Sequence, residues 1–282
     1  MVAGPVKIFI GSGEQSLLER KVLIYSLRKH TRRNLEITVF NGTHNAVEVD
    51  DQPPVLAPLP LHLKYRNQTE FSLYRYLIPE LCSFQGRAIY LDSDMICLAD
   101  IGNLFDLSMG SHDFLAKREY ADNNGEKMWG LSAMLINCEQ SRFPLAEIFS
   151  EIDQGLYSYT EFSQMGQRFL AHHPYQIGEL DASWNVFDRC DPGTRIIHYT
   201  DLFTQPWKYG GHPFGEIWFS YLRDAREKSY VTDHDIDLTI QRGYARPDLR
   251  EGNARRGTAK SGWLKWRRLV GGSRAKITDR SM

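Results

Sequence analysis

Residues 86–101 read GRAIYLDSDMICLADI, an apolar run that ends on two acids, Asp92 and Asp94, one residue apart. The segment at residues 88–91 has the length and composition of a buried central strand. The two acids then lie at its carboxyl end, which is where open α/β sheets bind their ligands. Because side chains two apart in an extended chain point to the same side, both carboxylates can reach one point.

Two carboxylates held this close repel each other and raise the pKa of one of them, unless a cation lies between them. A divalent ion is the simplest solution, and hard oxygen ligands suit Mg²⁺ or Mn²⁺. An aspartate that follows a strand also commonly caps a turn. The DSD sequence by itself leaves both interpretations open.

The flanking segments alternate between strand and helix patterns. Residues 6–10 and 36–40 form short apolar runs, and residues 16–30 between them carry apolar side chains at helical spacing. A strand, a helix and a strand in succession predict a parallel sheet with right-handed crossovers. The Pro-rich residues 51–65 predict a loop, and residues 69–81 predict a further helix. We therefore expect an α/β fold of the Rossmann-like type.

The first glycines of the chain do not form a dinucleotide fingerprint. Gly11, Ser12 and Gly13 lack the third glycine of GxGxxG, and Glu14 stands where a diphosphate would approach the helix. A Rossmann oxidoreductase is therefore not expected. Ile10, Gly11 and Ser12 can still pack on a nucleotide, since loops at this edge of a parallel sheet are the usual ligand site.

Composition bounds the class of protein. The chain has 282 residues, 42% of them hydrophobic, and no run reaches the roughly 18 to 20 apolar residues of a membrane span. The sequence begins without the pattern of a secretory signal, so we expect a cytoplasmic protein. The widely spaced Cys82, Cys97, Cys138 and Cys190 are expected to be reduced thiols and not a zinc site.

The net charge of −1 hides a strong asymmetry. Residues 242–282 contain twelve Lys or Arg and three Asp or Glu, a net of +9, so residues 1–241 carry −10. We expect a folded body at residues 1–228 and a basic, aromatic extension at residues 229–282. In the extension, residues 262–276 interleave tryptophans with cations, as an anchor at an anionic membrane surface does. A disordered tail without a partner is the alternative, and nucleic-acid binding is not expected.

Several segments, in order, resemble the motifs of one family. TEFSLYRYLIPEL at residues 69–81 precedes the YLDSD strand, and MLINCEQ (134–140), ELDASWN (179–185) and IIHYTDLFTQPW (196–207) follow it. Together they resemble glycosyltransferase family 8, the group of glycogenin and the lipopolysaccharide galactosyl- and glucosyltransferases, over roughly residues 5–225. The resemblance implies that the body is a GT-A catalytic domain, with a mixed, mostly parallel sheet flanked by helices, and that transfer retains the anomeric configuration.

The resemblance assigns roles to single residues. Asp92 and Asp94, with Ser93 between them, match the DxD that binds a divalent metal, typically Mn²⁺, which bridges the diphosphate of a nucleotide sugar. His198 matches the third metal ligand, and neutral imidazole is a suitable ligand for such an ion. Arg75 matches the arginine that contacts the donor, a position that a surface salt bridge would explain as well.

The last motif departs from the family pattern HxxGxxKPW. Asp201 replaces the glycine and Gln205 replaces the lysine that hold the diphosphate, and the motif is one residue longer after His198. An amide carries no charge, so stabilisation of the leaving group would depend on the metal, on Arg75 or on Lys208.

The motifs for the sugar are also altered. The family pattern FNxGVMLIN reads WGLSAMLIN here, with Gly130 and Ser132 in place of an asparagine and a glycine. The group nearest the reacting carbon should fall near residues 159–169, where Glu161 and Gln164 have suitable chemistry and a solvent-facing helix start is the alternative.

Trp184 and Asn185 match a Trp-Asn pair of the family. The resemblance places them among the residues around the donor. A buried tryptophan that packs under the site explains Trp184 equally well.

The combined prediction is a metal-dependent, retaining hexosyltransferase that moves glucose or galactose from a UDP-sugar to a saccharide or lipid-linked acceptor. No carboxylate is placed as a nucleophile, so we expect front-face attack by the acceptor. A catalytically decayed sugar-nucleotide-binding protein is the alternative, because the family's lysine and asparagine are missing. A phosphotransferase of the haloacid dehalogenase type is disfavoured, since Ile96 stands where that class has Thr or Val. The oligomeric state is not predicted.

Overall fold

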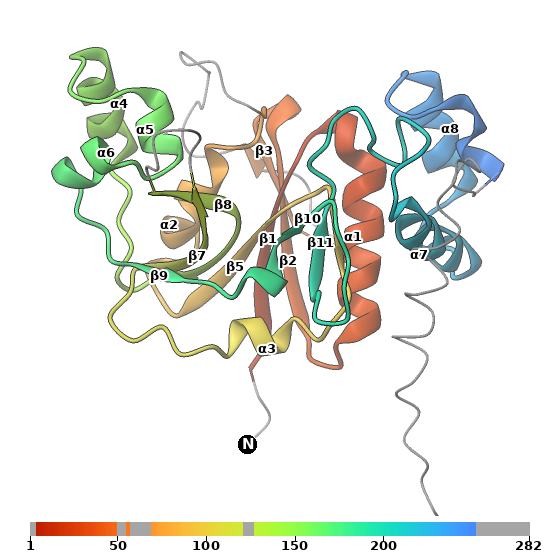
Figure 1. Cartoon of the computed structure of the whole chain (residues 1–282), viewed down its shortest axis with the longest axis horizontal. Coiled ribbons are helices and arrows are strands. Elements are labelled where there is room, and N and C mark those ends of the chain that lie inside the picture. The colour runs from red at the N-terminus through yellow and green to blue at the C-terminus, as the bar shows by residue number, and fades with distance from the viewer. Residues whose placement is uncertain (1–3, 50–54, 57–68, 121–126, 252–282) are drawn as a thin grey trace, which may run out of the picture.

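The computed structural model describes residues 4–49, 55–56, 69–120 and 127–251 (Figure 1). Its centre is an eight-stranded sheet with the order β4-β3-β2-β1-β5-β8-β7-β9. In this order the strands span Val55–Leu56, Ala46–Val49, Leu35–Asn41, Val6–Ser12, Arg87–Asp92, Lys127–Asn137, Phe114–Tyr120 and Ile177–Glu179. The predicted α/β fold is confirmed, and two residues of the predicted Pro-rich loop form the short strand β4.

Strand directions bring the carboxyl ends of the central strands to one edge. β1 pairs parallel with β2 and with β5, and β7 pairs parallel with β9. The pairs β2–β3, β3–β4, β5–β8 and β7–β8 are antiparallel. The strands β4, β2, β1, β5, β7 and β9 therefore run one way, and β3 and β8 run the other. Ser12, Asn41 and Asp92 lie together at the edge where β1, β2 and β5 end.

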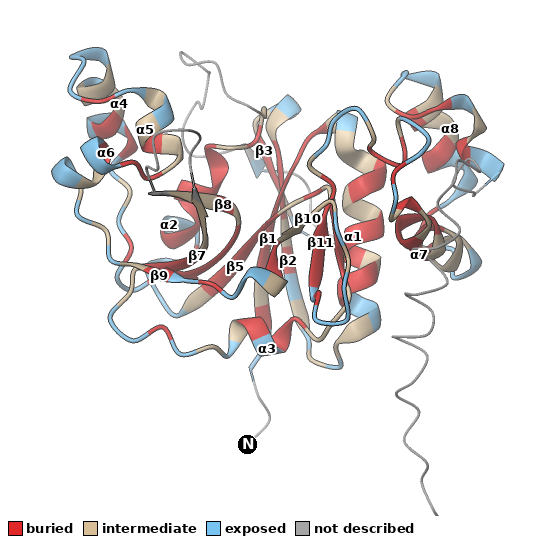
Figure 2. Cartoon of the chain, in the orientation of Figure 1, coloured by how far each residue is buried: buried red, intermediate tan, exposed pale blue. Residues whose placement is uncertain are grey.

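The two faces of the sheet bury different cores. On one face, Ile8 and Ile10 of β1 share a cluster with Leu23 and Leu27 of α1 (Leu17–His30), the helix that links β1 to β2. On the other face, Phe9 belongs to a cluster rich in aromatic rings. That cluster is covered by α4 (Leu145–Asp153), α5 (Tyr159–Ser163) and α6 (Gln167–His172), and Figure 2 shows buried residues along the strands between the helices.

A second, three-stranded sheet lies beside α1 (Figure 1). Its strands are β10 (Val186–Phe187), β11 (Ile196–His198) and β6 (Met95–Cys97). β6 follows β5 directly in the chain and pairs antiparallel with β11, with His198 opposite Met95. This pairing brings the end of β11 next to the DSD turn, although the two segments are far apart in the sequence.

The predicted helix at residues 69–81 is only partly correct. The segment begins with turns and continues as the 3-10 helix η3 (Tyr74–Leu77) and the short helix α2 (Ile78–Leu81). Pro79 has no N–H to donate, so an α-helix that began earlier would lose a backbone hydrogen bond there. The tighter turns bury this segment on every side, because all residues of η3 and the first two of α2 are buried.

The folded body continues past residue 228. After α7 (Gly215–Glu227), the chain forms α8 (Asp233–Gln241) and the 3-10 helix η5 (Pro247–Glu251). Val231, Ile236 and Leu249 are buried in one cluster with Trp207 and Trp218. Residues 229–251 of the predicted extension thus pack on the body, and residues 262–276 lie outside the described part of the chain.

Short elements complete the fold. They are the 3-10 helices η1 (Glu14–Ser16), η2 (Gly42–His44) and η4 (Ala182–Trp184) and the helix α3 (Gly102–Phe105). Among the residues described, no helix has both the length and the apolar character needed to cross a bilayer.

Candidate metal centre and adjoining cavity

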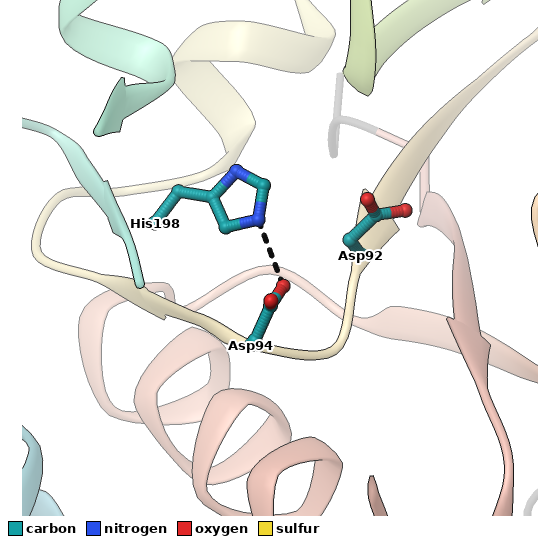
Figure 3. A group of neighbouring side chains, drawn as sticks. All are labelled: Asp92, Asp94 and His198. Carbon is teal, nitrogen blue, oxygen red and sulfur yellow. Dashed lines mark ion pairs between the residues drawn. The ribbon is translucent and has the colours of Figure 1, made fainter. Parts of the chain in front are cut away.

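Three potential metal ligands converge at the carboxyl edge of the large sheet (Figure 3). Asp92 ends β5, Asp94 lies in the turn before β6, and His198 ends β11. One ligand atom from each residue lies within 4.8 Å of the others, and His198 Nε2 is 2.8 Å from Asp94 Oδ1. The structure therefore brings together the three residues that the sequence predicted as a set.

The electrostatics of the group indicate excess negative charge. Burial raises the pKa of Asp92, and Asp94 raises it further against the opposing charge of Arg75. Burial alone would lower the pKa of His198, but the carboxylates of Asp94 and Asp92 outweigh it and raise that pKa. A cation among these groups would relieve the repulsion between the two acids.

The unmet bonding capacity of the group fits a divalent cation. Asp94 Oδ1 is buried and, within the described chain, meets no hydrogen-bond donor apart from the His198 ring. His198 Nδ1 lies 3.1 Å from Asn185 Oδ1, and donation there leaves the lone pair of Nε2 for a metal. Two carboxylates and one imidazole suit Mn²⁺ or Mg²⁺.

Neighbouring polar groups hold two of the ligands in place. Asn185 Nδ2 donates to Ser132 Oγ at 2.8 Å, which fixes the amide that orients His198. Gln205 is buried, and its Nε2 lies 3.4 Å from Asp94 Oδ2 and 3.0 Å from Tyr199 O. Gln205 therefore contacts Asp94 of the candidate metal group, and its predicted contact with a phosphate stays a prediction.

Arg75 is buried beside Asp92. Its Nη2 lies 3.5 Å from Asp92 Oδ1, its Nε donates to Ser72 O at 2.8 Å, and its Nη1 donates to Leu131 O. The guanidinium carbon is 4.6 Å from the centre of the Tyr90 ring, whose hydroxyl donates to Asp92 Oδ1 at 2.7 Å. Arg75 is thus a buried, anchored partner of Asp92 in the candidate metal group, not a surface salt bridge.

A cavity of about 230 Å³ adjoins the group. Its walls combine aromatic, hydroxyl and charged side chains from several elements: Thr69, Ser72, Arg75, Tyr76, Asp92, Glu119, Trp129, Gly130, Leu131, Ser132, Tyr159, Ser163, Gln164, Phe187 and His198. Gln164, which the sequence predicted near the sugar, is among them. Glu119 is also among them and was not predicted, because nothing in the local sequence marks one acid of a charged strand end as different from the others.

Other predicted residues have different surroundings. Glu161 does not line the cavity, and its Oε2 accepts the backbone N–H of Arg168 at 3.2 Å, at the start of α6. Ile10 is buried in the core of the sheet. The side chain of Ser12 lies 3.1 Å from Ser16 Oγ. These contacts are with the protein itself.

Gly11 permits a close approach of two side chains. A Cβ at this position would lie 2.2 Å from Tyr90 Oη and 2.5 Å from Phe71 Cδ2. The missing side chain therefore leaves room for the Tyr90 hydroxyl that bonds Asp92. Gly11 thus also supports Asp92 of the candidate metal group through Tyr90, and its predicted contact with a nucleotide stays a prediction.

The remaining predicted residues lie around the turn after β11 and under the site. Trp184 and Ser93 are buried, and the backbone N–H of Lys208 donates to Gln205 O at 3.0 Å.

Glu19 of α1 was not predicted: it is buried, its Oε2 has no hydrogen-bond partner among the described residues, and burial raises its pKa to about 8. The charges of Lys208 and Asp94 have smaller, opposite effects on that pKa.

Comparison with known proteins agrees with this geometry. The model of the family described as "Glycosyl transferase family 8" matches residues 60–158, which include Arg75, Asp92, Asp94 and Glu119. The Arabidopsis thaliana Protein CDI is 25% identical over 252 residues, which cover 80% of this chain and 89% of that protein.

Two solved structures share the fold. The bifunctional glycosyltransferase WbbM superposes with a TM-score of 0.57 at 15% identity, over 84% of this chain and 52% of the WbbM chain, so this chain spans about half of that protein. The galactosyltransferase LgtC, solved with donor and acceptor sugar analogues, gives a TM-score of 0.51 at 13% identity, over 88% of this chain and all of LgtC (100%). The partial family match and the shared GT-A fold together support a glycosyltransferase that resembles family 8.

Proposed function

We propose that the chain is a metal-dependent, retaining hexosyltransferase that uses a UDP-sugar, with glucose or galactose as the sugar, and a saccharide or lipid-linked acceptor. The observation that carries the proposal is the convergence of Asp92, Asp94 and His198 beside a cavity of about 230 Å³ at the carboxyl edge of the sheet. This is the edge at which open α/β sheets bind nucleotides.

The ligand set has a defined task in this proposal. When bound, Mn²⁺ or Mg²⁺ supplies a Lewis acid for the charge that develops on a departing diphosphate. Asp92, Asp94 and His198 hold the ion, and Asn185 keeps His198 in the tautomer that presents Nε2. The positive charge of Arg75 opposes the rise in the pKa of Asp92 that burial causes.

Retention requires either an enzyme nucleophile or attack by the acceptor on the face that the diphosphate leaves. We propose front-face attack. Asp92 is committed to the metal group, and Gln164 offers the cavity an amide, which can position hydroxyls through hydrogen bonds. Exclusion of water by the bound donor and acceptor would favour transfer over hydrolysis.

A sugar-nucleotide-binding protein without turnover is the second candidate. Gln205 supports it, because this uncharged side chain stands at the position of the family's lysine and is engaged by Asp94 and Tyr199 O. Release of UDP from UDP-glucose or UDP-galactose in the presence of Mn²⁺ separates the two candidates. Binding without release favours the second.

Thermal unfolding with Mn²⁺, UDP, UDP-glucose and UDP-galactose tests the proposal. A ligand present at 100 times its dissociation constant stabilises the folded state by about 2.7 kcal/mol. The stabilisation by each nucleotide should require Mn²⁺, and Asp94→Asn should remove that requirement together with most of the stabilisation. If no nucleotide raises the unfolding temperature of the wild type with Mn²⁺ present, the proposal is contradicted. If turnover is unchanged in Asp94→Asn, the proposed role of Asp94 as a metal ligand is contradicted.

Peripheral attachment to the cytoplasmic face of an anionic membrane through residues 262–276 is a further part of the proposal. Its support is the alternation of tryptophan with lysine and arginine in the sequence. Such attachment would place the site near a lipid-linked acceptor.

A further inference from the structure

Glu119 lines the cavity without a partner for one of its oxygens. Its Oε1 is buried and has no hydrogen-bond partner within the described part of the chain. A buried carboxylate oxygen without a donor is costly, and burial accordingly raises the pKa of Glu119. A ligand that brings hydroxyl groups into the cavity would satisfy this oxygen.

The register of the sheet explains how Glu119 reaches this position. On β7, Glu119 pairs with Met128 of β8, and Lys117 pairs with Gly130, after an irregularity between Ala116 and Lys117. Gly130 is therefore the diagonal neighbour of Glu119 across the two strands. Diagonal neighbours in an antiparallel pair are within reach of a long side chain.

The carboxylate of Glu119 occupies the space that a side chain at residue 130 would need. A Cβ on Gly130 would lie 2.2 Å from Glu119 Oε1 and 2.7 Å from its Cδ, far inside van der Waals contact. Both residues line the same cavity. The family pattern has an asparagine at position 130. Here β8 has no polar side chain at that position, and the carboxylate of Glu119 from β7 occupies the space instead.

The charges on the cavity wall restrict what can bind. Asp92 and Glu119 are acidic, and the cation Arg75 already contacts Asp92, Ser72 O and Leu131 O. Lys117 is not part of the wall, and its Nζ lies 3.5 Å from the centre of the Phe187 ring. A carboxylate on the sugar would therefore be repelled by Glu119, and no free cation on the described wall would offset this repulsion.

We propose that Glu119 is a specificity-determining residue of the sugar subsite: its carboxylate replaces the side chain missing at Gly130, accepts hydrogen bonds from the hydroxyls of an uncharged hexose, and disfavours a uronic acid. The inference rests on the proposed function. A carboxylate only accepts hydrogen bonds, whereas an amide both accepts and donates, so the exchange favours a sugar that presents hydroxyl hydrogens at this wall.

Four variants test the inference: Glu119→Ala, Glu119→Gln, Gly130→Asn and the double variant Glu119→Ala/Gly130→Asn. UDP with Mn²⁺ is the control ligand, because it carries the diphosphate and lacks the sugar. In Glu119→Ala, the affinity for UDP should stay within about twofold, while kcat/KM for UDP-glucose or UDP-galactose should fall about 10- to 100-fold, the range for a hydrogen bond to a charged group.

The remaining variants separate space from chemistry. Gly130→Asn should lower kcat/KM for the donor, because the new side chain collides with Glu119. The double variant should have a kcat/KM at least tenfold above that of Gly130→Asn. Such coupling is expected of residues in contact. Glu119→Gln should fold normally. Its ratio of kcat/KM for UDP-glucose to kcat/KM for UDP-glucuronate should be smaller than that of the wild type.

Several outcomes would overturn the inference. They are unchanged donor use in Glu119→Ala, an equal loss for UDP and UDP-hexose, and a wild type that prefers UDP-glucuronate. A loss of kcat with unchanged donor affinity would also overturn it, because Glu119 would then act in the reaction step and not in donor recognition. Failure of the proposed function looks different: the wild type would then bind neither UDP nor any UDP-sugar in the presence of Mn²⁺.

Discussion

His198 has two ring nitrogens, and the neighbour of one decides what the other can do. Nδ1 meets Asn185 Oδ1 at 3.1 Å, and Ser132 holds the amide of Asn185 from the other side. When Nδ1 donates to Asn185, neutral imidazole has a lone pair on Nε2. This lone pair faces Asp94, and a cation between the two residues would accept it. The role of His198 as a ligand therefore depends on two side chains that lie outside the metal group itself.

Glu19 makes stability depend on pH. Its folded pKa of about 8 lies above the ordinary value of 4.5, chiefly because of burial, so between these values the folded state holds a proton that the unfolded state releases. The free energy of unfolding should fall as the pH rises through this interval. Glu19→Gln cannot ionise, so its stability relative to the wild type should increase by roughly 1 to 4 kcal/mol from about pH 5 to pH 8.

Chemical denaturation of both proteins at a series of pH values measures this difference. Lys208, Arg20 and Asp94 also act on the pKa of Glu19, and all three are present in both proteins. A stability difference that does not change with pH would show that Glu19 is ionised in the folded protein.

At the scale of single residues, the sequence predicted the three side chains that lie together, and it missed their surroundings. Asp92, Asp94 and His198 stand in motifs, and their side-chain types restrict their chemistry. Glu119 was missed because its position in the cavity depends on the register of two strands, which the order of residues along one strand does not contain. Glu161 was flagged by chemical type alone, and its carboxylate bonds the start of α6.

The helix α8 joins the body through its first turn. Thr232 is its N-cap: the hydroxyl accepts the N–H of Asp235 at 3.2 Å, and Asp235 Oδ2 accepts the N–H of Thr232 at 2.8 Å. Asp235 Oδ1 also accepts a hydrogen bond from Lys21 Nζ at 2.6 Å, which links α8 to α1. One side chain thus serves both the helix start and the contact between helices.

Thr232→Ala should lower the free energy of unfolding by about 1 kcal/mol, the usual cost of a lost N-cap. Thr232→Ser keeps the hydroxyl and should lie within a few tenths of a kcal/mol of the wild type. Equilibrium denaturation of the three proteins gives both values. Equal losses in the two variants would mean that the methyl group, not the cap, accounts for the effect.

Among the elements, those with strong local patterns were predicted best. The strands at residues 6–10, 36–40 and 88–91 and the helix at 16–30 lie within β1, β2, β5 and η1 to α1. The helix at residues 69–81 was predicted too long, because apolar spacing cannot distinguish a 3-10 turn from an α-helix in so short a segment. The strand β4 has two residues, too few to give any periodicity.

At the scale of the whole molecule, the folded body includes more of the C-terminal part of the chain than charge and composition indicated. Residues 229–251 were assigned to the basic extension by composition. Their apolar side chains Val231, Ile236 and Leu249 nevertheless pack with two tryptophans of the body, Trp207 and Trp218. The order of strands along the chain predicted the α/β fold. The pairing of β6 with β11 could not be predicted, since both strands are short and distant in sequence.

Two truncations separate folding from membrane attachment. A chain that ends after Glu251 should unfold like the full chain and bind UDP with Mn²⁺ equally, and it should sediment less with phosphatidylserine vesicles. A chain that ends after Lys228 should be less stable, because Trp207 and Trp218 lose their apolar cover. Equal sedimentation of the full chain and the chain ending after Glu251 would contradict attachment through residues 262–276.

The proposed metal ligands lie on two separate sheets, which the antiparallel pairing of β6 with β11 brings together. Asp92 belongs to the large sheet and His198 to the small one, so an ion shared by them would close the long stretch of chain between the two residues into a loop. A cross-link of this kind reduces the entropy of the unfolded chain, as a disulfide does. Chelation should therefore quicken hydrogen exchange in β10 and β11 before it affects β1 and β2.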